Sequence, residues 1–111
     1  MYVVNVESMK PNDEMPGVKK RVLVGKEHGA RKFYLRHYTI APGTVMSLDK
    51  HVYEHELFVI AGEGTYECDG AQRTVRAGDA IWIQSNQVHR VNNLGSEPLI
   101  VLCCRGAEEI Y

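Results

Sequence analysis

Residues 43–62 read GTVMSLDKHVYEHELFVIAG, and they bring Asp49, His51 and His55 close together in the chain. A second stretch, GDAIWIQSNQVHRVNN, adds His89. Residues two apart on an extended strand point the same way, so Asp49 and His51 share a face. Three imidazoles and one carboxylate are typical ligands of divalent transition metals. The sequence therefore predicts a metal site made of Asp49, His51, His55 and His89.

Apolar and polar residues alternate in short runs along most of the chain, which is the pattern of β-strands that bury one face. Turns rich in Gly, Pro, Asn and Asp separate the runs, and Asp69-Gly70 predicts a hairpin. Many short strands with almost no helix favour a β-sandwich or a small barrel, an all-β fold. The predicted strands are 2–6, 19–24, 32–40, 45–48, 55–61, 64–68, 72–75, 80–83, 88–92 and 99–104.

The composition limits the class of protein. A chain of 111 residues suits one domain, residues 1–111, and 13 basic against 14 acidic residues argue against a nucleic-acid partner. Three cysteines without CxxC spacing indicate neither a disulfide framework nor a zinc ribbon, and they favour a reducing compartment. No apolar run reaches the length of a membrane span, and no leader pattern is visible. We therefore expect a cytoplasmic protein with no membrane partner.

The strand predicted at 55–61 is apolar on both faces. Leu57 and Val59 lie on one face, and Phe58 and Ile60 lie on the other. One face lines the interior, so the other needs a cover, and a second subunit is the simplest one. The sequence therefore predicts a homodimer.

Three further side chains are candidates for the wall of a substrate pocket. Arg36 and Tyr38 alternate with His37 on one strand, so their face is a candidate wall for a small anionic substrate, whereas a lone strand histidine is left out of the metal set. Met46 is expected to contribute apolar wall near the metal.

Two residues of the loop between the ligands are weaker candidates for catalysis. Glu54 is expected to hydrogen-bond a ligand imidazole or to carry a proton, and Tyr53 is expected to act as a gate or as the proton carrier. The competing reading of Tyr53 is a simple packing contact in the loop.

The spacing of these residues resembles the first motif of the cupin superfamily, G-x5-H-x-H-x3-4-E-x6-G. In this chain it reads Gly43-x5-Asp49-x-His51-x3-His55-x6-Gly62. Asp49 stands where the first histidine is usual, and His55 stands where the glutamate is usual. The set of four candidate ligands therefore still contains three histidines and one acid.

The second cupin motif, G-x5-P-x-G-x2-H-x3-N, is matched in spacing as well. Gln84 and Asn86 replace its proline and glycine, which concerns the shape of the turn more than metal ligation. The stretches 18–25 and 54–59 are also similar to a manganese-binding single-domain cupin of a hyperthermophilic bacterium. That similarity extends over residues 18–104.

The resemblance implies a jelly-roll barrel, the double-stranded β-helix of cupins, with its core at about 18–104. It implies a homodimer, with the N-terminal strand expected at the interface, and an inward-facing Cys103 that lines the pocket. It also implies one divalent transition metal per subunit, with manganese or iron favoured and nickel, copper or zinc as alternatives.

The activity that the resemblance implies is an oxygen-dependent oxidation or cleavage of a small organic substrate, which is a dioxygenase-type reaction. Two alternatives stay open, because a fold alone does not establish an activity. One is a metal-dependent isomerase or lyase of a sugar acid or small carbonyl compound. The other is a non-catalytic module that binds a small molecule.

Overall fold

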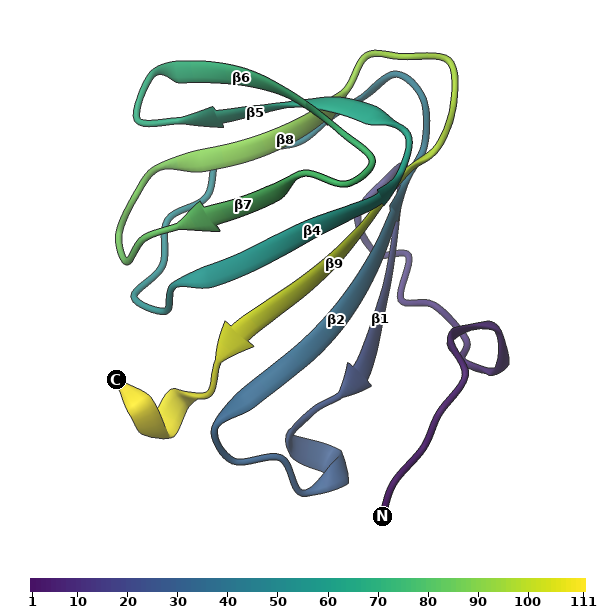
Figure 1. Cartoon of the computed structure of the whole chain (residues 1–111), viewed down its shortest axis with the longest axis vertical. Coiled ribbons are helices and arrows are strands. Elements are labelled where there is room, and N and C mark those ends of the chain that lie inside the picture. The colour runs from purple at the N-terminus through teal and green to yellow at the C-terminus, as the bar shows by residue number, and fades with distance from the viewer.

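Two antiparallel β-sheets face each other and enclose the core in this computed structural model, which describes residues 1–111 (Figure 1). Buried side chains from both sheets form one apolar cluster between them, with Leu57 and Val101 on one side and Tyr66 and Val91 on the other. The strands are β1 (Val18–Val24), β2 (Phe33–Ile40), β3 (Thr44–Val45), β4 (His55–Ala61), β5 (Glu63–Cys68), β6 (Ala71–Arg76), β7 (Ala80–Ile83), β8 (His89–Asn93) and β9 (Leu99–Gly106).

The order of the strands is that of a jelly roll. One sheet runs β1-β2-β9-β4-β7 and the other runs β3-β8-β5-β6, so strands far apart in the sequence pair side by side. Helix is limited to three single turns of 3-10 type. These features confirm the predicted all-β jelly-roll class.

Alternation along β4 places its side chains as the sequence predicts. His55, Leu57 and Val59 are buried, whereas Phe58 and Ile60 are exposed on the outer face. The period of two therefore sorts a metal-ligand candidate and two core residues to one side of the strand.

The hairpin predicted at Asp69-Gly70 is present between β5 and β6. Both residues have a positive φ, 49° for Asp69 and 84° for Gly70. A two-residue turn with positive φ at both positions matches the right-handed twist of the strands that it joins, and Asp-Gly is a favoured pair for it.

The strand predicted at residues 2–6 is wrong. Instead, Val6–Ser8 forms a 3-10 turn, whose N-cap Asn5 accepts a hydrogen bond from the backbone of Glu7 through its side chain. This local bond competes with strand pairing. The chain that follows this turn reaches the edge strand β1, where Asn12 pairs with Lys20 in an isolated bridge (Figure 1).

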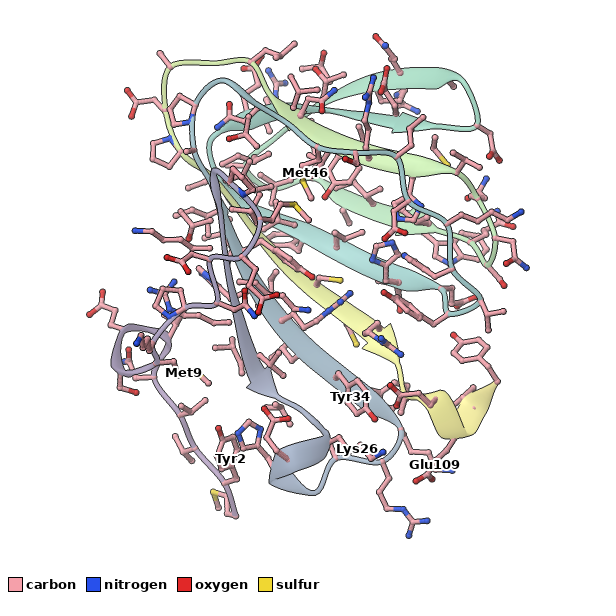
Figure 2. The ribbon with its side chains drawn as sticks, turned by 180° about the vertical axis from the view of Figure 1, so that it is seen from behind. Tyr2, Met9, Lys26, Tyr34, Met46 and Glu109 are labelled. Atoms are coloured by element: carbon pink, nitrogen blue, oxygen red, sulfur yellow. The ribbon has the colours of Figure 1, made fainter.

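Side-chain contacts fasten the start of the chain to the same edge. The Tyr2 hydroxyl donates to the Leu23 carbonyl at 2.9 Å, and the Tyr2 ring stacks on His28 at 4.7 Å. Figure 2 shows Tyr2 against the turn that carries Lys26. The N-terminal segment thus covers backbone groups of β1 that an open edge would leave unpaired.

The strand predicted at 45–48 is shorter than expected, because β3 ends at Val45. The next backbone amide, that of Met46, donates to the side-chain Oδ1 of Asn92 at 3.0 Å instead of to a strand carbonyl. The other predicted strands are present with ends that agree within two residues. No helix in the structure is both long enough and apolar enough to traverse a lipid bilayer.

Candidate metal centre and its cavity

Three histidines from different parts of the fold meet between the sheets. His55 opens β4, His89 opens β8, and His51 lies in the loop before β4. One ring nitrogen from each lies within 4.8 Å of the other two. The ring centroids are 4.7–5.0 Å apart. The structure therefore brings these three predicted ligands together.

Backbone pairing holds the loop against β8. Asp49 and His89 form an isolated antiparallel bridge, with N to O distances of 2.8 and 2.9 Å in the two directions. The loop also contacts the turn before β8, because Asn86 donates its amide to the His51 carbonyl at 2.8 Å. These bonds join the two motifs, although they lie far apart in the chain.

A hydrogen bond at Nδ1 sets the tautomer of two of the three rings. Nδ1 of His51 lies 2.7 Å from the Tyr53 carbonyl, and Nδ1 of His89 lies 2.7 Å from the Gln87 carbonyl. A carbonyl only accepts, so Nδ1 carries the proton in both rings and Nε2 keeps its lone pair. Such partners are what orient metal-binding imidazoles in proteins.

His55 is buried, with 8% of its surface exposed. Its Nδ1 lies 3.3 Å from Sγ of Cys103, and its Nε2 is buried without any hydrogen-bond partner. Burial, with the neighbouring rings of His89 and His51, lowers the pKa of His55 to about 3. Burial also lowers the pKa of His51. These two rings are therefore biased toward the neutral form, which metal ligation requires.

The donor atoms of this cluster fit a divalent transition metal. Nε2 of His55 is a buried polar atom without a partner, and such atoms are costly unless something pairs with them. Neutral imidazole nitrogens suit manganese, iron, nickel, copper and zinc. The residues positioned to hold such an ion are His51, His55 and His89.

Asp49, the fourth predicted ligand, lies beside the cluster rather than within it. Its Oδ2 is 4.0 Å from Nε2 of His51, but the side chain is 68% exposed and is not part of the mutually close set. Its Oδ1 accepts a hydrogen bond from the amide of Lys50. Direct ligation by Asp49 thus stays a prediction.

The two weaker catalytic candidates have different surroundings. The Tyr53 ring stacks on His51 with centroids 3.7 Å apart, and the guanidinium carbon of Arg105 lies 3.5 Å from the centroid of the Tyr53 ring. Tyr53 therefore packs tightly against a ligand ring and lines the cavity. Glu54 is exposed and is not among the residues that line the cavity. The structure does not bring its carboxylate to the site.

The histidines open into a cavity of about 640 Å³ between the sheets. A volume of that order is typical of pockets for small organic molecules. Figure 2 shows Met46 between the two sheets. All four predicted pocket residues line this cavity, namely Arg36, Tyr38, Met46 and Cys103.

Cys103 links the cavity wall to the histidines. It is fully buried, its Sγ contacts Nδ1 of His55, and the same sulfur accepts a hydrogen bond from Nη2 of Arg36 at 3.1 Å. Burial raises the pKa of the Cys103 thiol, although Arg36 acts in the opposite direction. The inward orientation of Cys103 expected from the resemblance agrees with this placement.

Sequence reasoning missed Lys20, which also lines the cavity. A signal for it was present, because Lys20 shares the parity of Val18 and Val22 on β1 and so points inward with them. Arg105 was missed as well, and its parity with Cys103 was the available signal.

Comparison with known proteins gives three informative relatives. An uncharacterized protein of Methanocaldococcus jannaschii is 33% identical over 63 residues, which cover 56% of this chain and 50% of that protein. The oxalate-binding protein of Thermotoga maritima is 30% identical over 80 residues, which cover 69% of this chain and 65% of that protein. The chain thus matches about half to two thirds of the length of these relatives.

A solved structure supports the fold over nearly the whole chain. The polyketide cyclase RemF of Streptomyces resistomycificus superimposes with a TM-score of 0.89 at 24% identity, covering 97% of this chain and 80% of that one. At this identity the likeness shows the fold alone.

The family assignment rests on more than the fold. The family described as "Cupin domain" matches residues 36–105, which include all three clustered histidines and most of both sheets. The chain therefore belongs to the cupin family.

Proposed function

We propose that this protein is a metal-dependent oxidoreductase of dioxygenase type that acts on a small organic substrate. The observation that carries the proposal is the convergence of His51, His55 and His89 at the cavity wall, with a nitrogen of His55 left buried and unpartnered. One divalent ion per subunit, manganese or iron by preference, would be held by these three rings.

Three protein ligands leave coordination positions open. A metal bound there supplies a Lewis acid for a substrate oxygen and, for manganese or iron, a redox partner for dioxygen. The three histidines line the cavity, so a substrate in it would lie beside an ion that they hold.

The residues of the chain have separate tasks in this proposal. The carbonyls of Tyr53 and Gln87 keep His51 and His89 in the tautomer that offers Nε2. Tyr53 also restrains His51 by stacking on it. Arg36, Tyr38, Met46 and Cys103 form the wall that orients the substrate.

The exposure of the acids at the cavity favours an oxygen-dependent reaction over the reaction of an isomerase or lyase. The acidic residues among those lining the cavity are Glu14 and Asp49, and both are exposed. A reaction that removes a proton from carbon needs a positioned base. Oxidation by dioxygen of a substrate that is already an anion has no such requirement.

Elemental analysis of untagged protein tests the metal site. We expect about one manganese or iron per chain, lost in His51→Ala and His55→Ala and retained in His37→Ala. His37 is a matched control, because it lies on β2 but is not among the cavity residues. Retention of metal in the His55→Ala protein would contradict the proposal.

Substrate-dependent oxygen uptake tests the reaction class. We expect uptake with some members of a panel of small organic acids, and none after metal removal. Turnover that proceeds without oxygen would favour a metal-dependent isomerase or lyase.

The binding module stays the second candidate, because the Thermotoga relative is named an oxalate-binding protein. Thermal stabilisation by a ligand that is never consumed would favour this function. We also propose a cytoplasmic location, which suits the three free cysteines.

A further inference from the structure

Two cations line the cavity without a carboxylate partner. Arg36 is 7% exposed, and neither Arg36 nor Lys20 takes part in any of the ion pairs of the structure. Both side chains line the cavity. Burying a charge is costly unless it is paired, so the cavity carries a positive site that no ion pair of the chain neutralises, although Glu14 also lines the cavity.

The strand register places Arg36 beside the histidine cluster and Lys20 one step further from it. Arg36 is level with Cys103, which in turn is level with Leu57, one inward position beyond His55 on β4. Lys20 is level with Tyr38, one inward position further along β2. Each step of two residues along a strand is about 6.7 Å. The inner face of the sheet therefore leads from the histidines to Arg36 and then to Lys20.

The guanidinium of Arg36 is held in place before any ligand binds. Its Nη2 donates to Cys103 at 3.1 Å, and its carbon lies 5.5 Å from the Tyr38 ring and 5.7 Å from the Tyr53 ring. Its Nε has no hydrogen-bond partner. Because its contacts are one sulfur and two aromatic faces, the charge is oriented but not neutralised.

Lys20 lies near enough to sense this charge. Burial, together with Arg36 and Arg105, lowers the pKa of the Lys20 ammonium. An anion between the two cations would relieve that repulsion. Apolar side chains such as Val101 and Met46 line the space around them.

We propose that the ligand of this cavity is a two-ended organic acid of several carbon atoms. One oxygen function lies at the histidine cluster, and a second, anionic group lies between Arg36 and Lys20. The inference rests on the proposed metal site for the first end only. The cavity of about 640 Å³ leaves room for a carbon skeleton between the two ends.

Binding of adipate and hexanoate tests the proposal, because the two probes have the same number of carbon atoms and differ in the second carboxylate. Dissociation constants are measured by NMR titration with metal-free and with Mn²⁺-loaded protein at pH 7. With metal-loaded protein we expect adipate to bind at least tenfold more tightly than hexanoate. With metal-free protein we expect the two to differ by less than threefold, because only the cationic end is then available.

Charge variants locate the cationic end. We expect Lys20→Gln and Arg36→Gln each to weaken hexanoate binding to metal-free protein by at least fivefold. Lys19→Gln is the matched control, since Lys19 is exposed at the neighbouring position of β1, and it is expected to change nothing. If Arg36→Gln does not fold, Lys20→Gln against Lys19→Gln carries the test.

The outcomes separate this inference from the proposed function. Equal effects of Lys20→Gln and Lys19→Gln would overturn the anion site, and equal binding of both probes to metal-loaded protein would overturn the two-ended ligand. Loss of metal binding, with cation-dependent hexanoate binding retained, would overturn the proposed function while supporting the anion site.

Discussion

Sγ of Cys103 lies 3.3 Å from Nδ1 of His55, and the same sulfur lies 3.1 Å from Nη2 of Arg36. One atom of β9 therefore contacts both a candidate metal ligand and a cation of the cavity wall. If His55 binds metal through Nε2, its Nδ1 carries a proton and donates it to this sulfur. Cys103 is thus placed to orient the ring and the guanidinium together.

We predict that Cys103→Ala weakens metal binding by roughly tenfold or more, because removal of the acceptor of a ligand imidazole has effects of that order. Cys103→Ser keeps an acceptor and is expected to recover part of the affinity. Competition with a chelating dye measures the dissociation constants. Cys104→Ala is the control, since Cys104 is the neighbouring residue and points to the other face. Equal affinity of the Cys103→Ala and wild-type proteins would contradict the orienting role.

Asp49 and His51 are expected to differ in their contribution to metal binding. The Asp49 carboxylate is exposed and lies outside the close set, so we predict that Asp49→Ala weakens binding by roughly tenfold. His51→Ala is expected to abolish binding in the micromolar range while leaving the circular dichroism of the barrel unchanged. Isothermal titration with Mn²⁺ measures both.

Glu54→Ala serves as the control for Asp49→Ala, because Glu54 is an exposed acid of the same loop. We expect no change in metal affinity. An Asp49→Ala protein as defective as His51→Ala would establish Asp49 as a full ligand, as the sequence predicts. Loss of turnover in Glu54→Ala would restore its predicted catalytic role.

Stability of the metal-free protein is expected to fall in acid because of His55. Its pKa is about 3 in the folded protein and near 6.5 when unfolded, so the unfolded chain takes up a proton that the folded protein refuses. The stability is therefore fully present above pH 6.5 and is lost as the pH falls toward 3. One such group contributes a slope of about 1.4 kcal/mol per pH unit in that window.

Urea unfolding in the presence of a chelator, at pH values from 7 to 4, measures this slope. His55→Asn removes the titrating ring, and we expect its stability to vary less with pH than that of the wild type. The difference between the two curves isolates His55 from the carboxylates that also titrate in acid. Parallel curves would show that His55 is not responsible.

The outer face of β4 and its neighbours carries an apolar patch, which we define as Phe58, Ile60, Trp82 and Leu102. Phe58, Ile60 and Trp82 are exposed, and the register places Phe58 level with Leu102. Such a patch favours a partner, and a second copy of the chain supplies the same surface. We predict a homodimer that Phe58→Asp converts to a monomer.

Size-exclusion chromatography with light scattering measures the oligomeric state. Val45→Asp is the control, because Val45 is also exposed but lies on the other sheet. We expect this variant to stay dimeric. A wild-type protein that is monomeric at high concentration would rule out the predicted interface.

Most strands were predictable because the alternation of apolar and polar residues within a strand shows which of its faces is buried. β4 and β7 begin and end at the predicted residues, since alternation and flanking turns are local properties. The strand predicted at 2–6 is wrong, because a local pattern does not show whether a segment has a partner strand. Its composition suits a strand, but local hydrogen bonds of Asn5 and the docking of the segment on β1 replace regular pairing.

The spacing of His51, His55 and His89 predicted a metal site, and the resemblance of the two motifs to those of cupins predicted the family, because motif spacing is a local property of the sequence. The placement of Asp49 and the approach of Cys103 to both His55 and Arg36 emerged only from the fold. These relationships depend on which strands become neighbours and in what register, and that pairing is a long-range outcome of packing two sheets around one core.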